Sequence, residues 1–229
     1  MSAPLILAFD TAGPHCTAAL CRGPAVLAQR HLDQARGQAE SLMPLLQEVL
    51  EAGGADWADL DAIGVGIGPG NFTGIRISVA AARGAAMGLG IPAIGASMFD
   101  VIAAQAPETR PLLVSLAAPR DQTYVQALNA DGTQSDALLV DPGAPLPPSL
   151  NVGATWHVLG HRAGDIAKSN GAESLELAPL DLGTSIAAIA AAKFANAGDR
   201  SLPPPSPMYV RAPDAAPPST KPPRILGRV

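Results

Sequence analysis

A glycine-rich stretch, GVGIGPGNFTGIR, spans residues 64–76 and carries the clearest candidate chemistry in this sequence. Glycines between a strand and a helix let backbone N–H groups approach an anion at the start of the helix. The candidate nucleotide loop in this stretch consists of Gly68, Gly70, Thr73, Gly74 and Arg76. The stretch lacks the lysine of a P-loop, and its glycine spacing is not that of the dinucleotide fingerprint. Two interpretations stay open, a turn that holds phosphate and a tight strand-to-helix turn.

Asp10 and Thr11 extend this candidate loop, in the sequence FDTAG at the end of the first apolar run. A carboxylate followed by a hydroxyl and a glycine turn is a common arrangement around a metal–phosphate complex. Aspartate at the end of a strand is also a frequent turn residue, because its side chain bonds the backbone nearby. The two residues by themselves do not decide between these roles.

Two histidines four residues apart, His157 and His161, imitate a pair of metal ligands. That spacing aligns two ligands only on a helix, whereas the residues between them favour a strand that ends in a turn. The spacing of the serine, cysteine and histidine residues does not indicate a catalytic triad or dyad. The spacing therefore predicts no metal site at these histidines and no catalytic triad or dyad.

The elements that must position the candidate loop are predicted from apolar periodicity and turn residues. Residues 5–11, 16–22 and 25–32 read as three strands, followed by a helix over 40–52, a strand over 62–68 and a helix over 73–89. A strand at 91–97 and a helix at 98–106 complete the first half. Three antiparallel strands followed by alternating helices and strands predict a mixed sheet covered by helices.

The second half is less regular, and it predicts a smaller, degenerate α/β lobe. We divide the chain into a first lobe over residues 1–106, a second over 107–201 and a proline-rich extended tail over 202–229. The last helix, over 184–198, falls in the second range.

Two helices of the first lobe could meet another subunit. The helix over 73–89 repeats small residues at three- and four-residue steps, which lets another helix come close, and the helix over 40–52 is rich in leucine. An intramolecular partner is the commoner case, but two adjacent apolar helices also suit one side of an intersubunit bundle. The predicted interface residues are Leu42, Met43, Leu46, Leu50, Ser78, Ala81, Ala82 and Ala85.

Composition limits the classes of function. Hydrophobic residues make up 48% of the 229 residues and charged residues 15%, with a formal net charge of −5, so the chain is not built to grip a nucleic-acid backbone unaided. Cys16 and Cys21 lie five positions apart in one predicted strand, and this odd spacing predicts opposite faces and no disulfide. Reduced cysteines, a first apolar run too short for a signal peptide and no membrane-spanning run predict a cytoplasmic protein.

The segments LILAFDTAG, AESLMPLLQEVL, IGVGIGPGNFTGIRISVAAARGAA and PMYVR resemble, in order and spacing, the bacterial TsaB (YeaZ) family. The resemblance covers residues 4–100, with a short echo at 207–211. It implies an actin-like, ribonuclease H-like fold of two α/β lobes with mixed sheets covered by helices. It also implies a role in the N6-threonylcarbamoylation of the adenosine 3′ of the anticodon in tRNAs that read A-starting codons.

The resemblance further implies the partners. TsaD, which transfers the threonylcarbamoyl group, would form a heterodimer with this chain, and the ATPase TsaE would join a larger complex. A homodimer would form when the chain is alone, and tRNA would be reached only indirectly. The TsaD metal motif lies in a region that contains no histidine here, residues 83–105, and Ala117 and Gln122 depart from the family pattern in the second lobe.

We therefore expect a non-catalytic assembly subunit that requires no cofactor and has no activity alone, with at most weak binding of ATP or ADP. The alternative is a nucleotide-binding transferase or kinase of actin-like fold that acts on its own.

Overall fold

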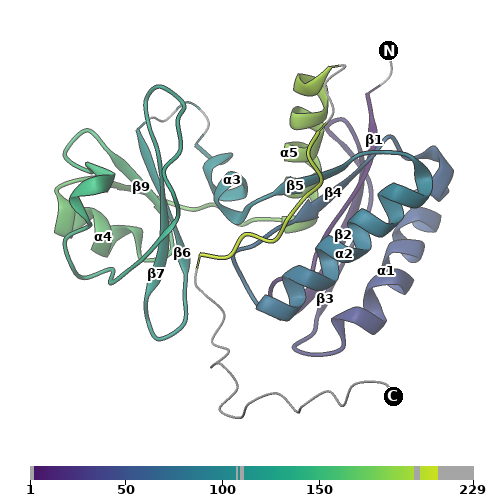
Figure 1. Cartoon of the computed structure of the whole chain (residues 1–229), viewed down its shortest axis with the longest axis horizontal. Coiled ribbons are helices and arrows are strands. Elements are labelled where there is room, and N and C mark those ends of the chain that lie inside the picture. Colours follow the sequence, from purple (N-terminus) through teal and green to yellow (C-terminus); the bar gives the residue numbers. More distant parts are fainter. Residues whose placement is uncertain (1–2, 107, 109–110, 199–201, 211–229) are drawn as a thin grey trace, which may run out of the picture.

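The computed structural model describes residues 3–106, 108, 111–198 and 202–210, and these fold into two α/β lobes that lie side by side (Figure 1). Each lobe contains a five-stranded mixed sheet, with strand orders β3-β2-β1-β4-β5 and β10-β9-β6-β7-β8. The predicted two-lobed α/β architecture is confirmed.

The first sheet follows the predicted order of strands. Its strands are β1 (Leu5–Asp10), β2 (His15–Arg22), β3 (Ala25–Asp33), β4 (Ala62–Gly66) and β5 (Ala93–Ala96). β1 pairs antiparallel with β2 and parallel with β4, so the ends of β1 and β4 meet at one edge of the sheet. β1 is buried along its whole length, as its continuous apolar run predicts.

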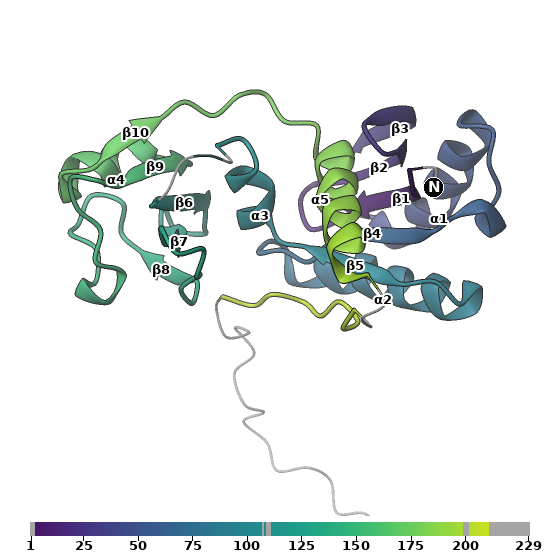
Figure 2. The ribbon, with the colours of Figure 1, turned by 90° about the horizontal axis from the view of Figure 1, so that it is seen from above.

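Helices cover both faces of this sheet. α1 (Gln38–Ala52) lies over β2 and β3, and α2 (Phe72–Leu89) lies over β4, on the same face as α1. α5 (Leu182–Ala197) covers the opposite face and packs on β1, β2 and β4 (Figure 2). Residues of β1 alternate between the two faces, so both faces present apolar side chains that must be covered.

The second sheet is covered by one helix that follows it in the chain and one that precedes it. Its strands are β6 (Leu112–Ala117), β7 (Thr123–Leu128), β8 (Leu138–Val140), β9 (His157–Gly160) and β10 (Glu173–Leu175). α4 (Ala163–Asn170) packs on one face, and α3 (Met98–Ala103) packs on the other through Phe99 and Ile102. Two single 3-10 turns, Trp57–Asp59 and Pro148–Leu150, lie in the connections.

The lobe boundaries predicted from sequence need correction at two helices. α3 falls within 1–106 but covers the second sheet, and α5 falls within 107–201 but covers the first. The chain order of a helix does not state which sheet it covers, because each sheet accepts any helix that presents an apolar face. α4 and β10 were not predicted, since both are short.

The C-terminal segment 202–210 is extended and runs from the end of α5 across the edge of the first lobe to the second lobe (Figure 1). Pro205 is buried near Gly95, and the Met208 N–H donates a 2.8 Å hydrogen bond to the Ile67 carbonyl. Met208 and Val210 pack against the apolar cluster under α3. The rest of the predicted tail, 211–229, lies outside the described residues.

Within the described part of the chain, no helix combines the length and apolar character that crossing a bilayer requires.

Candidate functional site

The glycine turn is packed against the turn that follows β1. A Cβ atom at Gly74 would collide with the Thr11 carbonyl oxygen, and one at Gly70 would lie 2.6 Å from the Ala12 carbonyl oxygen. Neither glycine faces open space, so both are needed for the close approach of two backbone segments. Gly68, in the same turn, accepts a hydrogen bond of 2.9 Å from the Met98 N–H.

Hydrogen bonds join the same two segments. The Thr11 hydroxyl donates to the Gly74 carbonyl at 2.7 Å, and the Asn71 N–H donates to the Ala12 carbonyl at 2.6 Å. The Asn71 side chain caps α2, because its Oδ1 accepts from the N–H groups of Thr73 and Gly74 at 2.9 and 3.1 Å. These N–H groups are the ones that a phosphate at the helix start would use.

Asp10 ends β1 and is only 1% exposed. Its Oδ1 accepts from the Ala12 N–H and lies 2.8 Å from His15 Nε2, which forms an ion pair when His15 is protonated. Its Oδ2 is buried beside Gly66 and has no hydrogen-bond partner among the described residues. Sequence reasoning missed His15, although an antiparallel hairpin of β1 and β2 brings the residue that starts β2 beside the one that ends β1.

Arg76 does not lie over the glycine turn. Its guanidinium stacks 3.8 Å from the centre of the Phe72 ring, and its Nε donates a 2.9 Å hydrogen bond to the Tyr209 hydroxyl. The Phe72 and Tyr209 rings lie 5.0 Å apart. Although Arg76 was counted in the candidate nucleotide loop, its side chain attaches α2 to the C-terminal segment.

These contacts do not fit a nucleotide phosphate at the glycine turn. The N–H groups of Thr73 and Gly74 are already bonded, the glycines are covered by the Thr11–Ala12 backbone, and the nearby cation is engaged elsewhere. Asp10 Oδ2, which has no hydrogen-bond partner among the described residues, is enclosed. Of the two interpretations of the stretch, the geometry favours the tight strand-to-helix turn.

The predicted interface residues divide into two groups. Five of them are at most 1% exposed and lie in the core between the helices and their own sheet: Leu42, Leu46, Leu50, Ser78 and Ala82. Their assignment to an intersubunit surface is wrong, because the apolar stripe of each helix is already covered by the sheet of the same chain. Met43 is 49% exposed, and Ala81 and Ala85 are half-buried.

The solvent side of α2 carries a stripe of small residues. We call this surface the α1–α2 outer face, and it consists of Met43, Ala80, Ala81, Gly84, Ala85, Met87 and Gly88. Met87 is 85% exposed, and a Cβ atom at Gly84 or Gly88 would meet nothing within 4 Å. Sequence periodicity found the small residues of α2 but not which of them face outward.

The strand predicted around His157 and the opposite faces predicted for Cys16 and Cys21 are confirmed. His157 lies in strand β9, where its Nε2 is 3.4 Å from Glu173 Oε2 and no helical ligand pair forms. The described residues contain no group of three or more histidine, cysteine, aspartate or glutamate side chains placed to hold a metal ion. Cys16 and Cys21 are free, buried and in the clusters on opposite faces of the first sheet. Burial raises the pKa of each thiol to about 11, with a smaller contribution from Asp10 at Cys16 and from Asp181 at Cys21.

Known proteins are similar to this chain in sequence and in fold. A family model described as TsaD, tRNA N6-adenosine threonylcarbamoyltransferase, matches residues 26–141. An uncharacterized protein of Mycobacterium tuberculosis is 37% identical over 145 residues, which cover 62% of this chain and 67% of that protein. The tRNA threonylcarbamoyladenosine biosynthesis protein TsaB of Escherichia coli is 38% identical over 98 residues, 43% of this chain and 42% of that protein.

This chain belongs to the TsaB/YeaZ family. The solved structure of YeaZ from Pseudomonas aeruginosa aligns with 90% of the chain and 99% of its own length, at 23% identity and a TM-score of 0.64. A second structure from that organism, described as similar to peptidase YeaZ, aligns at 22% identity and a TM-score of 0.67 over 91% of this chain and all of its own. The two-lobed α/β fold predicted for the chain is shared with these YeaZ structures.

Proposed function

We propose that this TsaB/YeaZ family member is a non-catalytic pairing subunit in the N6-threonylcarbamoylation of tRNA. It docks a TsaD-type transferase subunit, which carries the chemistry and the contact with tRNA, and a TsaE-type ATPase joins the pair. Family membership supports the pathway, since relatives carry the name tRNA threonylcarbamoyladenosine biosynthesis protein. The observation that carries the pairing role is the exposed α1–α2 outer face.

The outer face suits a helix of another subunit. Ala80, Gly84 and Gly88 form a strip of small side chains along α2, so a second helix can approach this strip at short interaxial distance. Met43 and Met87 add flexible apolar contact area at its margins. Two helices that present such a surface form one half of a four-helix arrangement, with two helices of the partner or of a second copy of this chain.

The glycine turn supports this role by fixing α2 rather than by binding a ligand. Its hydrogen bonds and close packing with the Thr11–Ala12 backbone hold the start of α2 against the end of β1. A helix held at its first turn presents its outer face in a defined orientation, which lowers the entropy lost on docking.

Chromatography with light scattering tests the pairing. Wild type mixed with a TsaD-type subunit is expected to elute as a heterodimer, and Met43→Asp and Gly88→Arg are expected to elute as folded monomers. Leu46→Asp is the contrasting variant: it is expected to unfold, because this side chain is 1% exposed. An intact heterodimer with both outer-face variants would place the pairing surface elsewhere.

Reconstitution tests the pathway. The complete mixture contains an enzyme that forms threonylcarbamoyl-adenylate, the TsaD-type and TsaE-type subunits, tRNA, ATP, threonine and bicarbonate. Omitting this chain from it is expected to abolish modified tRNA. The buried, unpartnered Asp10 Oδ2 is the observation that keeps the nucleotide-dependent enzyme as an alternative. Calorimetric binding of ADP that Asp10→Asn abolishes, together with turnover by the isolated chain, would favour it.

A further inference from the structure

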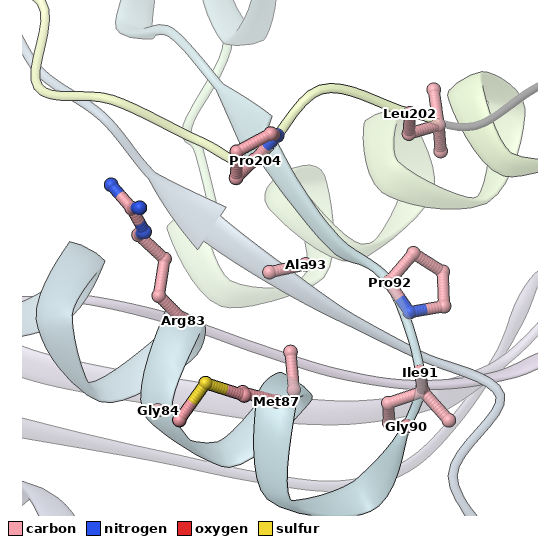
Figure 3. A pocket seen from close by; sticks show the side chains of 10 residues that line it. Arg83, Gly84, Met87, Gly90, Ile91, Pro92, Ala93, Leu202 and Pro204 are labelled. Carbon is pink, nitrogen blue, oxygen red and sulfur yellow. The ribbon is translucent and has the colours of Figure 1, made fainter.

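A groove opens beside the C-terminal half of α2. It has a volume of about 520 Å³ and lies between α2, the connection from α2 to β5 and the start of the C-terminal segment (Figure 3). Met87, Ile91, Pro92, Leu202 and Pro204 are among the side chains that line it. A volume of this size accommodates one or two large apolar side chains.

The walls of the groove are apolar with one exception. Arg83 is the single charged residue among those that line it, and Figure 3 shows its side chain extending from α2 toward the segment that carries Pro204. Among the described residues the Arg83 side chain has no ion-pair or hydrogen-bond partner, whereas Arg30 and Arg162 form ion pairs and Arg76 donates a hydrogen bond. An unpaired guanidinium at the edge of an apolar groove is complementary to a carboxylate attached to an apolar group.

The groove is continuous with the α1–α2 outer face. Gly84 and Met87 belong to both, so a partner that covers the outer face also reaches the edge of the groove. Met87, which is 85% exposed, stands between the two surfaces and would be covered from both sides.

We propose that the transferase subunit paired with the outer face also inserts an apolar side chain into this groove and places a neighbouring carboxylate on Arg83. This inference rests on the proposed function and names an anchor for the same partner. The apolar side chain covers Met87 and the walls formed by Pro92 and Leu202. The carboxylate gives Arg83 the ion pair that it lacks within this chain and fixes the rotation of the partner about the helices.

Affinity measurements with the intact chain and a TsaD-type subunit test the anchor. Arg83→Glu is expected to weaken binding by about tenfold or more, since a like charge then faces the carboxylate. Met87→Ala is expected to weaken it several-fold through the loss of apolar contact. Lys168→Glu is the matched control, because it makes the same change of charge at an exposed position on α4 of the second lobe and is expected to leave the affinity unchanged.

The outcomes separate the anchor from the pairing role. Wild-type binding that is unchanged in both Arg83→Glu and Met87→Ala would overturn the anchor and leave the pairing subunit in place. Weakening in Arg83→Glu that Lys168→Glu reproduces would also overturn the anchor, because it would report net charge. Absence of wild-type binding would overturn the pairing role and the anchor together. Circular dichroism of each variant verifies that the fold is retained.

Discussion

Gly74→Ala and Gly84→Ala place the same methyl group on the same helix with opposite consequences. Both glycines lie within α2. An added Cβ at Gly84 meets nothing within 4 Å, so alanine is expected to stabilise the helix by about 0.5–1 kcal/mol through the lower entropy of the unfolded chain. An added Cβ at Gly74 collides with the Thr11 carbonyl oxygen, a backbone atom that cannot rotate away.

The expected loss of folding free energy in Gly74→Ala combines two costs and one smaller gain. Overpacking costs about 1–3 kcal/mol. Moving α2 away also weakens the 2.7 Å bond from the Thr11 hydroxyl to the Gly74 carbonyl and the 2.6 Å bond from the Asn71 N–H to Ala12. Each such bond contributes about 1 kcal/mol, and the propensity gain of alanine offsets up to about 1 kcal/mol. The net destabilisation is about 2–4 kcal/mol, or roughly 5–15 °C in Tm for a chain of this size.

Thermal and urea unfolding followed by circular dichroism measure both variants, at concentrations low enough to exclude association. The expected order of stability is Gly84→Ala, wild type, Gly74→Ala. If Gly74→Ala is as stable as wild type, the start of α2 is not held against the turn after β1. The structural role assigned to the glycine turn would then be refuted.

Two further predictions concern the thiols and the C-terminal segment. The pKa of Cys16 and of Cys21 is raised from 9.0 to about 11, so both thiols are expected to resist a disulfide reagent at neutral pH until the protein unfolds. The free energy of unfolding is expected to fall as the pH rises from 9 toward 11, because the thiols of the unfolded chain ionise first. Thiol titration and melts across that range measure this, and a double alanine variant that shows the same fall would contradict it. Tyr209→Phe removes only the hydroxyl bonded to Arg76 and is expected to lower stability by less than about 1 kcal/mol. Tyr209→Ala also removes the contact with the Phe72 ring and is expected to lower it by about 1–2 kcal/mol; equal losses in the two variants would contradict the importance of the ring contact.

Much of the first lobe could be predicted because its signals are local. The apolar run of β1, the turn residues around the hairpins and the small-residue periodicity of α2 each lie within a short window. The second lobe gave weaker signals, since β8 and β10 have three residues each and α4 has eight. The candidate nucleotide loop was recognised as a segment. Residue spacing could not show that Asn71 already bonds its N–H groups and that the Thr11–Ala12 backbone covers its glycines.

The sequence by itself determined the order of the elements, the family and the glycine positions where α2 meets β1, because these depend on neighbouring residues and on motif order. Only the tertiary structure decided which residues remain accessible. Leu46 and Ala82 share a sequence pattern with a pairing surface, yet the sheet of the same chain covers them, while Gly84 and Met87 face outward. Arg76 likewise contacts Tyr209, far along the chain. Burial and contact are properties of two surfaces that meet, and a sequence pattern describes one surface at a time.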